Sequence, residues 1–219
     1  MMTAFTRLAA SLLAVSWLGA AGCSFLSPQP DPSRFFTLTP LPEAMAHQRV
    51  AASEFAGVTY GLGPVQLPAY LDRNAIATRV SLTEVTYSTH DLWAEPLQTN
   101  VRRVLVENLS ALLGTDRIVV YPWLTTVKVD YQVAIDIVRF EDTATGTQLT
   151  ARWQIVDGHT GAPLLLRETD LVGTAGGHDA KASVAALSSA VGDLSRDIAA
   201  ALRQLPAPET PLPATRKRS

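Results

Sequence analysis

The chain has 219 residues, and its 18 Lys and Arg stand against 20 Asp and Glu, which gives a formal net charge of −2 at pH 7. This balance excludes the strongly basic surface of a typical nucleic-acid-binding domain, so no nucleic acid is expected as a partner. The single cysteine excludes an intramolecular disulfide. Burial of apolar side chains must therefore stabilise the fold, and the length suits one domain with its own core.

Residues 1–22 have the pattern of a cleaved signal peptide. One cation, Arg7, precedes an apolar run from Leu8 to Leu18, and small residues follow that run up to Cys23. The run is too short to span a bilayer. The pattern therefore predicts export of the chain and cleavage immediately before Cys23.

Cys23 lies where a bacterial lipoprotein carries its lipid. We expect this cysteine to become the first residue of the mature protein and to bear acyl chains such as palmitate, each buried CH₂ contributing about 0.8 kcal/mol to membrane binding. The next residue, Ser24, is not the aspartate of an inner-membrane retention signal, so by analogy the anchor would go to the outer membrane, on its periplasmic face. Ala20 stands where the usual site has leucine, and the alternative is ordinary secretion with a free thiol at Cys23.

Proline-rich segments flank the predicted domain. Residues 23–33 contain Pro28, Pro30 and Pro32, which prevent regular hydrogen-bonded structure and indicate an extended tether behind the lipid. An α+β domain is expected over residues 34–205. Residues 206–219 contain four prolines and end in three basic residues and a serine, a composition typical of a disordered tail.

Apolar periodicity predicts the elements of this domain in chain order. Alternating or aromatic-rich strand patterns cover 34–39, 58–65, 75–80 and 84–89, and a helix follows from Pro96 to Gly114. Longer strand patterns cover 117–121, 127–140, 147–157 and 162–173, with turn-forming residues between the last three. A second helix begins near Asp179 and ends at Pro206, with an apolar stripe on one side and mostly serine and alanine on the other.

These patterns predict an α+β fold in a single domain. Its mostly antiparallel sheet would lie in two clusters of strands, each followed by one long amphipathic helix packed on it. The apolar stripe of the second helix is explained by core packing. The small residues on its other side would allow a close approach of another subunit.

The most distinctive segment of the domain runs from Gly61 to Arg73. Gly63-Pro64 bends the chain, Leu67 and Leu71 are placed to dock inward, and a proline suits the first turn of a short helix. A partner surface is predicted at Pro68, Tyr70, Leu71, Asp72 and Arg73. The alternative makes Tyr70 a half-buried core residue and Asp72 a cap or turn residue.

This segment carries a resemblance to a known family. The residues Gly63-Pro64-Val65, Leu67-Pro68 and Tyr70-Leu71-Asp72-Arg73, with Arg34–Leu38 before them and Leu92–Leu97 after them, resemble the ABC-type transport auxiliary lipoprotein family. Its best-described type is the paraquat-inducible-protein C lipoprotein of mammalian-cell-entry (MCE) lipid-transport systems. The resemblance implies a non-catalytic accessory subunit that docks such a system to the outer membrane. It also implies a homo-oligomer and an MCE-domain partner in the periplasm or the inner membrane.

The residues give little support for catalysis. The four histidines, at 47, 90, 159 and 178, are scattered without metal-ligand spacing, and the chain has no G-x-S-x-G motif. We expect no catalytic residues, no metal and no cofactor. Two alternatives stay open: a lipid-anchored envelope hydrolase that combines Asp and His from separate loops, and a structural lipoprotein that helps to assemble the envelope.

Overall fold

The computed structural model describes residues 31–42, 57–173 and 179–206. The predicted signal peptide, Cys23, most of the tether and the tail beyond residue 206 lie outside the described residues. The described residues from Ser33 onwards belong to one compact unit. None of the described helices is both long enough and apolar enough to cross a membrane.

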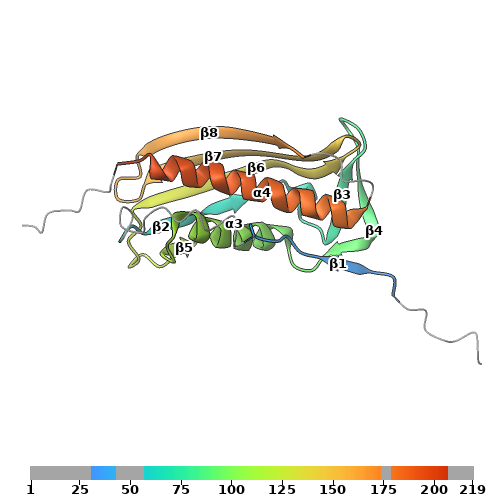
Figure 1. Cartoon of the computed structure of the whole chain (residues 1–219), viewed down its shortest axis with the longest axis horizontal. Helices are drawn as coiled ribbons and strands as arrows, with labels where there is room; N and C mark the ends of the chain where they lie inside the picture. The colour runs from blue at the N-terminus through green and yellow to red at the C-terminus, as the bar shows by residue number, and fades with distance from the viewer. Residues whose placement is uncertain (1–30, 43–56, 174–178, 207–219) are drawn as a thin grey trace, which may run out of the picture. The chain divides into compact units, whose positions relative to one another are not determined.

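Eight strands and two long helices make up the described part of this unit (Figure 1). The strands are β1 (Arg34–Phe36), β2 (Tyr60–Gln66), β3 (Ala75–Arg79), β4 (Val85–Trp93), β5 (Ile118–Val120), β6 (Tyr131–Thr143), β7 (Gly146–Asp157) and β8 (Pro163–Val172). The helices are α3 (Leu97–Leu113), α4 (Ala180–Arg203) and the short 3₁₀ helix η2 (Ala69–Leu71). All these strands and both long helices were expected, with boundaries shifted by a few residues.

Strand β6 is the centre of the sheet. One of its edges pairs with β7, which in turn pairs with β8, and both of these ladders are antiparallel. Its other edge is shared: β2 pairs with the first half of β6 and β3 with its last residues, both in parallel. β5 extends the sheet beyond β2, while β4 and then β1 extend it beyond β3.

The α+β class and the two packed helices are confirmed, but the sheet is mixed. Four strand pairs are parallel and three are antiparallel, although the longest ladders are antiparallel. For three of the parallel pairs, β2 with β5, β2 with β6 and β3 with β6, the cause is α3, which carries the chain back to the end of the sheet where β2 begins (Figure 1). As a result β5 and β6 run in the same direction as β2. The two expected clusters of strands are joined in one sheet.

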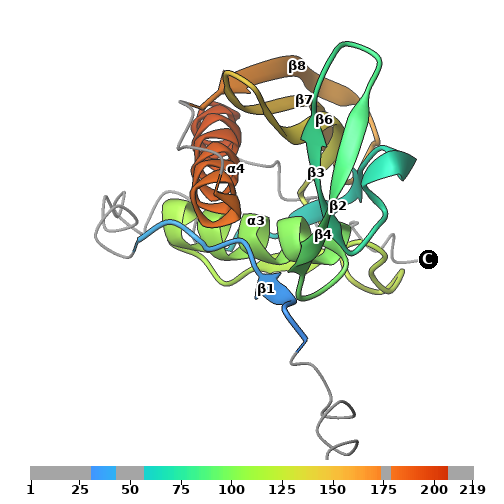
Figure 2. The ribbon, with the colours of Figure 1, turned by 90° about the vertical axis from the view of Figure 1, so that its right-hand side faces the viewer.

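Both long helices pack on one face of the sheet (Figure 2). The apolar stripe of α4 meets the inward side chains of β6 and β7, and that of α3 packs on α4, β2 and β5. The most deeply buried residues include Val101, Val104, Leu105, Val191, Leu194, Ile198, Val133, Leu149 and Ile155. Full burial of one such side chain contributes about 1.5–3 kcal/mol. The opposite face of the sheet is covered by neither α3 nor α4, and we call it the helix-free face.

Gly114 ends α3 in the left-handed conformation, with φ 66°, and its N–H donates to the Ser110 carbonyl. A Cβ at this position would meet no atom within 4 Å, so a substitution would bring backbone strain without a clash. We expect Gly114→Ala to lower the free energy of unfolding by about 1 kcal/mol, as measured by urea denaturation. Gly114→Asn should lose less, because asparagine tolerates this conformation better. Equal stability of Gly114→Ala and the unmodified protein would contradict this account.

Candidate functional site

The predicted partner segment forms a turn on the helix-free face. β2 separates from β6 after Gln66 pairs with Asp136, and β3 rejoins β6 where Thr78 pairs with Asp142. Between these points the chain makes η2, in which the Leu71 N–H donates to the Pro68 carbonyl at 2.9 Å. The turn therefore bridges the gap that β2 and β3 leave along the edge of β6.

A buried carboxylate fixes this turn to β6. Glu141 is fully buried although its side chain faces away from the helices, since Phe140 before it packs in the core. The Tyr70 hydroxyl donates to Glu141 Oε2 at 2.8 Å, and the Arg79 guanidinium donates to both carboxylate oxygens. Burial and the hydrogen bond to Glu141 raise the pKa of Tyr70, so the phenol stays neutral. The hydrogen bond to Glu141 raises the pKa of Arg79, which holds the guanidinium charged.

A second set of contacts comes from β4. The Tyr87 hydroxyl donates to the Tyr70 carbonyl at 3.0 Å, and the Arg73 guanidinium lies 4.7 Å from the centroid of the Tyr87 ring. Leu71 is buried in the core and Tyr70 is half-buried, whereas Asp72 and Arg73 are exposed. A partner surface at this turn stays a prediction, and it would present Asp72 and Arg73 rather than Leu71.

The helix-free face also has a cavity beside the turn. Its volume is about 350 Å³, and its lining includes Gln66 of β2, Asp136 of β6, Arg152 of β7 and Leu166 of β8. Cavities of this size hold small ligands in other proteins. Because Gln66 directly precedes the turn, the cavity and the turn form one continuous region of this face.

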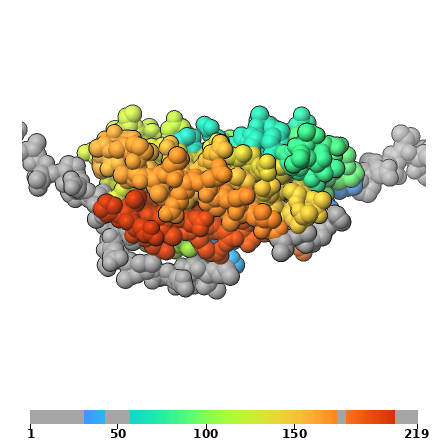
Figure 3. Space-filling view, turned by 90° about the horizontal axis from the view of Figure 1, so that it is seen from above, coloured from blue at the N-terminus to red at the C-terminus, as the bar shows by residue number. Residues whose placement is uncertain are grey.

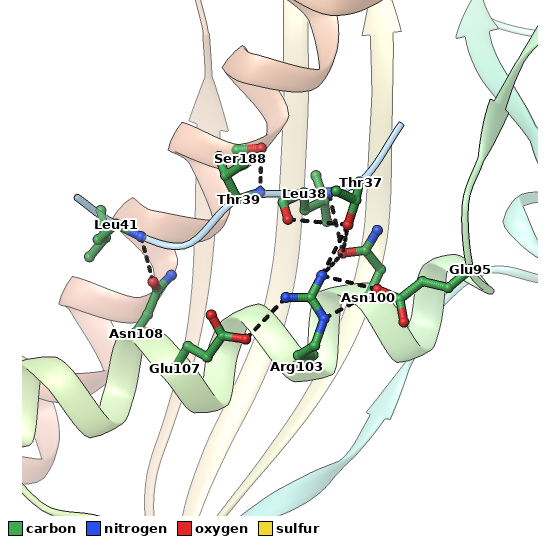
Figure 4. A network of polar contacts seen from close by, with 10 residues as sticks. All are labelled: Thr37, Leu38, Thr39, Leu41, Glu95, Asn100, Arg103, Glu107, Asn108 and Ser188. Atoms are coloured by element: carbon green, nitrogen blue, oxygen red, sulfur yellow. Dashed lines mark hydrogen bonds and ion pairs between the residues drawn. The ribbon is translucent and has the colours of Figure 1, made fainter. Parts of the chain in front are cut away.

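A feature that sequence reasoning missed lies on the helices. The sequence predicted a strand over residues 34–39, but β1 ends at Phe36. Residues 37–41 instead run along α3 and against α4 without regular secondary structure, and we call this segment the strap (Figure 4). Asn100 Oδ1 accepts the Leu38 N–H at 3.2 Å, and Asn108 Oδ1 accepts the Leu41 N–H at 2.7 Å.

The second helix, α4, also contributes to the site that binds the strap. Ser188 Oγ of α4 accepts the Thr39 N–H at 3.2 Å, and the Asn108 amide donates to Ser195 Oγ at 3.1 Å. Gly192 leaves room for the strap, since a Cβ there would lie 2.6 Å from Leu41 Cδ2. The strap therefore occupies part of the small-residue side of α4. Two features of the sequence could have indicated this site. Asn100 and Asn108 lie eight residues apart in α3, and the small residues Ser188, Gly192 and Ser195 lie three or four apart in α4.

Arg103 of α3 binds the first residue of the strap, Thr37. Its guanidinium donates to Glu95, Glu107 and Thr37, each at 3.0 Å. Burial opposes the charge, but the hydrogen bonds to Glu95 and Glu107 outweigh it and raise the pKa of Arg103. The arginine thus joins the chain before α3, the helix itself and the first strap residue.

The histidines in the described residues do not form a metal site. Across 31–42, 57–173 and 179–206, no three His, Cys, Asp or Glu side chains lie close enough to hold a metal ion. His159 Nε2 lies 3.0 Å from Asp130 Oδ1, but Asp130 also accepts the Thr59 N–H at 2.7 Å and joins the turn after β7 to the start of β2. The pair has a structural role at this end of the sheet.

Comparison with protein-family models shows to which family this chain is related. The family model of the ABC-type transport auxiliary lipoprotein component matches residues 36–199, from the end of β1 into α4. The chain belongs to this family. Among curated proteins, no sequence matches this auxiliary lipoprotein significantly.

Solved structures share the fold of this auxiliary lipoprotein. Protein XCC0632 from Xanthomonas campestris, assigned to the family model DUF330, is 15% identical with a TM-score of 0.62, over 76% of this chain and 93% of that one. A crystal structure of an uncharacterized protein is 19% identical with a TM-score of 0.62, over 78% of this chain and 98% of that one. At these identities the likeness extends to the fold alone.

Proposed function

We propose that this auxiliary lipoprotein is a periplasmic protein held at the outer membrane by lipid on Cys23, where it serves as a non-catalytic accessory subunit of an ABC/MCE-type lipid-transport system. The observation that carries the proposal is the family match over residues 36–199. The partner would be an MCE-domain subunit in the periplasm or the inner membrane. Lipid selection and energy supply would belong to the other subunits, and the protein would act as a homo-oligomer.

The strap supports the anchoring part of this proposal. The predicted tether leads directly into β1 and the strap, whose backbone is bound by side chains of both α3 and α4. A force on the lipid would therefore be transmitted to the sheet through β1 and to the two helices through the strap. A subunit that docks a transport assembly to a membrane needs such a coupling.

The partner contact would lie on the helix-free face. The turn presents Asp72 and Arg73, and the Glu141 contacts hold it in one position before a partner arrives. A prepositioned turn loses less conformational entropy on binding than a flexible one. β1 and the strap would thus bear the membrane anchor, and the turn on the helix-free face would contact the transport subunit.

We would test the proposal in cells, with photoreactive residues placed at Asp72 and Arg73 in the full-length protein. Capture of an MCE-domain protein from both positions is expected, and a photoreactive residue at Ala185, exposed on α4, should not capture it. The Cys23→Ala variant should leave the outer-membrane fraction. Capture of an MCE protein from Ala185 alone, of copies of this chain alone, or of unrelated envelope proteins would contradict the proposal.

A further inference from the structure

Strand β8 has an open edge. It is ten residues long, and within 31–42, 57–173 and 179–206 it pairs only with β7. It is the outermost strand on its side of the sheet (Figure 1), and its orange atoms are visible along the length of the strand in the view from above (Figure 3). The free edge of a strand presents unpaired N–H and C=O groups, which are a template for another strand.

The ladder with β7 defines which residues form this edge. The Gly173 N–H donates to the Thr147 carbonyl at 2.8 Å, and Val172 lies opposite Gln148 in the following pair. Because the bonded pairs of an antiparallel ladder alternate, the backbone groups of Leu166, Glu168 and Asp170 point away from β7. The side chains of these residues lie on the helix-free face, since those of Thr169 and Leu171 face the helices.

Along most of its length, this edge lacks several of the features that protect edge strands from pairing. Beyond its first residue, β8 contains no proline and no lysine, and its register with β7 is regular from Leu165 to Val172. Arg167 is charged, but its guanidinium lies 5.9 Å from the centroid of the Trp153 ring instead of blocking the edge. Two apolar side chains are largely exposed, Leu166 at 74% and Val172 at 71%. The surface is therefore able to accept a strand and bury apolar area with it.

The charges on the edge argue against a second copy of this chain as the occupant. In the two antiparallel registers that overlap most, β8 paired with itself would place Glu168 opposite Glu168 or Arg167 opposite Arg167. Like charges directly opposite each other destabilise a strand pair. A strand with basic side chains at two alternate positions would instead complement Glu168 and Asp170.

We propose that β8 binds an extended segment of a partner protein as an added strand, with basic residues opposite Glu168 and Asp170 and an apolar residue beside Leu166. The segment pairs through its backbone with β8, and its alternate side chains extend the helix-free face. This site goes beyond the proposed function, which uses the turn at Asp72 and Arg73 and needs no pairing at β8. Failure at β8 would leave the cross-linking results at the turn unaffected.

The test compares Glu168→Pro with Glu168→Ala in the full-length lipoprotein. Both variants lose the exposed ion pair with Arg152, but only proline removes the N–H at the open edge. The ladder with β7 does not use this N–H, so both variants should fold and melt at similar temperatures. A photoreactive residue at Leu164, on the same face of β8, reports the bound segment.

We expect Leu164 to cross-link to a segment with alternating apolar and basic residues, identified by mass spectrometry of the joined peptides. The yield should fall at least tenfold in Glu168→Pro and stay within twofold in Glu168→Ala. Equal yields from the two variants, cross-links only to other copies of this chain, or no cross-link would overturn the proposal. A lower melting temperature of Glu168→Pro alone would overturn the assigned direction of the N–H, which amide hydrogen exchange at residue 168 checks independently.

Discussion

Arg79→Met is expected to lower the free energy of unfolding by about 3 kcal/mol, because it leaves the fully buried carboxylate of Glu141 without its counter-ion. Methionine keeps most of the apolar stem of the arginine, so the loss reports the charge rather than the packing. The measurement is equilibrium urea denaturation of the purified protein, followed by tryptophan fluorescence. The same variant should increase amide hydrogen exchange at Leu71, because the turn loses part of its attachment to β6.

A double variant separates the charge from other effects. Arg79→Met with Glu141→Leu removes both members of the pair, and replacement of a buried ion pair by apolar residues is often neutral or stabilising. We expect the double variant to recover most of the lost stability, although Tyr70 then lacks its acceptor. Arg152→Ala, which breaks an exposed ion pair with Glu168, is the matched control and should change little. A double variant no more stable than Arg79→Met would contradict this account.

Asn108→Ala is expected to lower the free energy of unfolding by about 2 kcal/mol and to loosen the strap. The Asn108 side chain is buried and makes two hydrogen bonds, one from the Leu41 N–H and one to Ser195. Alanine leaves the half-buried Leu41 N–H without an acceptor and the buried Ser195 Oγ without its donor, and an unsatisfied buried group costs about 1–3 kcal/mol. Amide hydrogen exchange at Leu41 should therefore increase by more than the global loss of stability accounts for.

The neighbouring residue gives the control for the strap. Glu107 lies on the same helix and loses only an exposed i,i+4 ion pair with Arg103 when it is replaced by alanine. Glu107→Ala should leave exchange at Leu41 nearly unchanged, because exposed pairs of this kind contribute little. If the two variants have equal effects on Leu41, then Asn108 does not hold the strap.

The strap and the turn are held in place in the same way. In each, a buried polar side chain binds a segment that has little regular structure of its own: Asn108 binds the strap and Glu141 the turn. The strap continues the predicted membrane tether, and the turn presents Asp72 and Arg73. Loosening either segment should weaken the link between the lipid anchor and a transport partner without unfolding the sheet.

Local periodicity determined the elements from the sequence alone. The apolar stripes of α3 and α4 and the alternation of Tyr131, Val133 and Ile135 in β6 depend only on side-chain directions within a few residues. The run from Gly63 to Arg73 identified the family, since the match to residues 36–199 bears out that resemblance. These signals are contained in short stretches of chain, so they can be read before the path of the backbone is known.

Only the tertiary structure decided which strands are neighbours and which polar side chains meet. Arg79 and Glu141 are 62 residues apart, and Thr39 and Ser188 are 149 residues apart. No periodicity relates such positions, because their contact depends on the direction in which α3 returns the chain to the sheet. The parallel pairing of β2 with β6, the burial of Glu141 and the place of the strap all follow from that path. Sequence pattern therefore determined the elements and the family of this protein, and the path of the chain through the sheet and the two helices decided where its candidate sites lie.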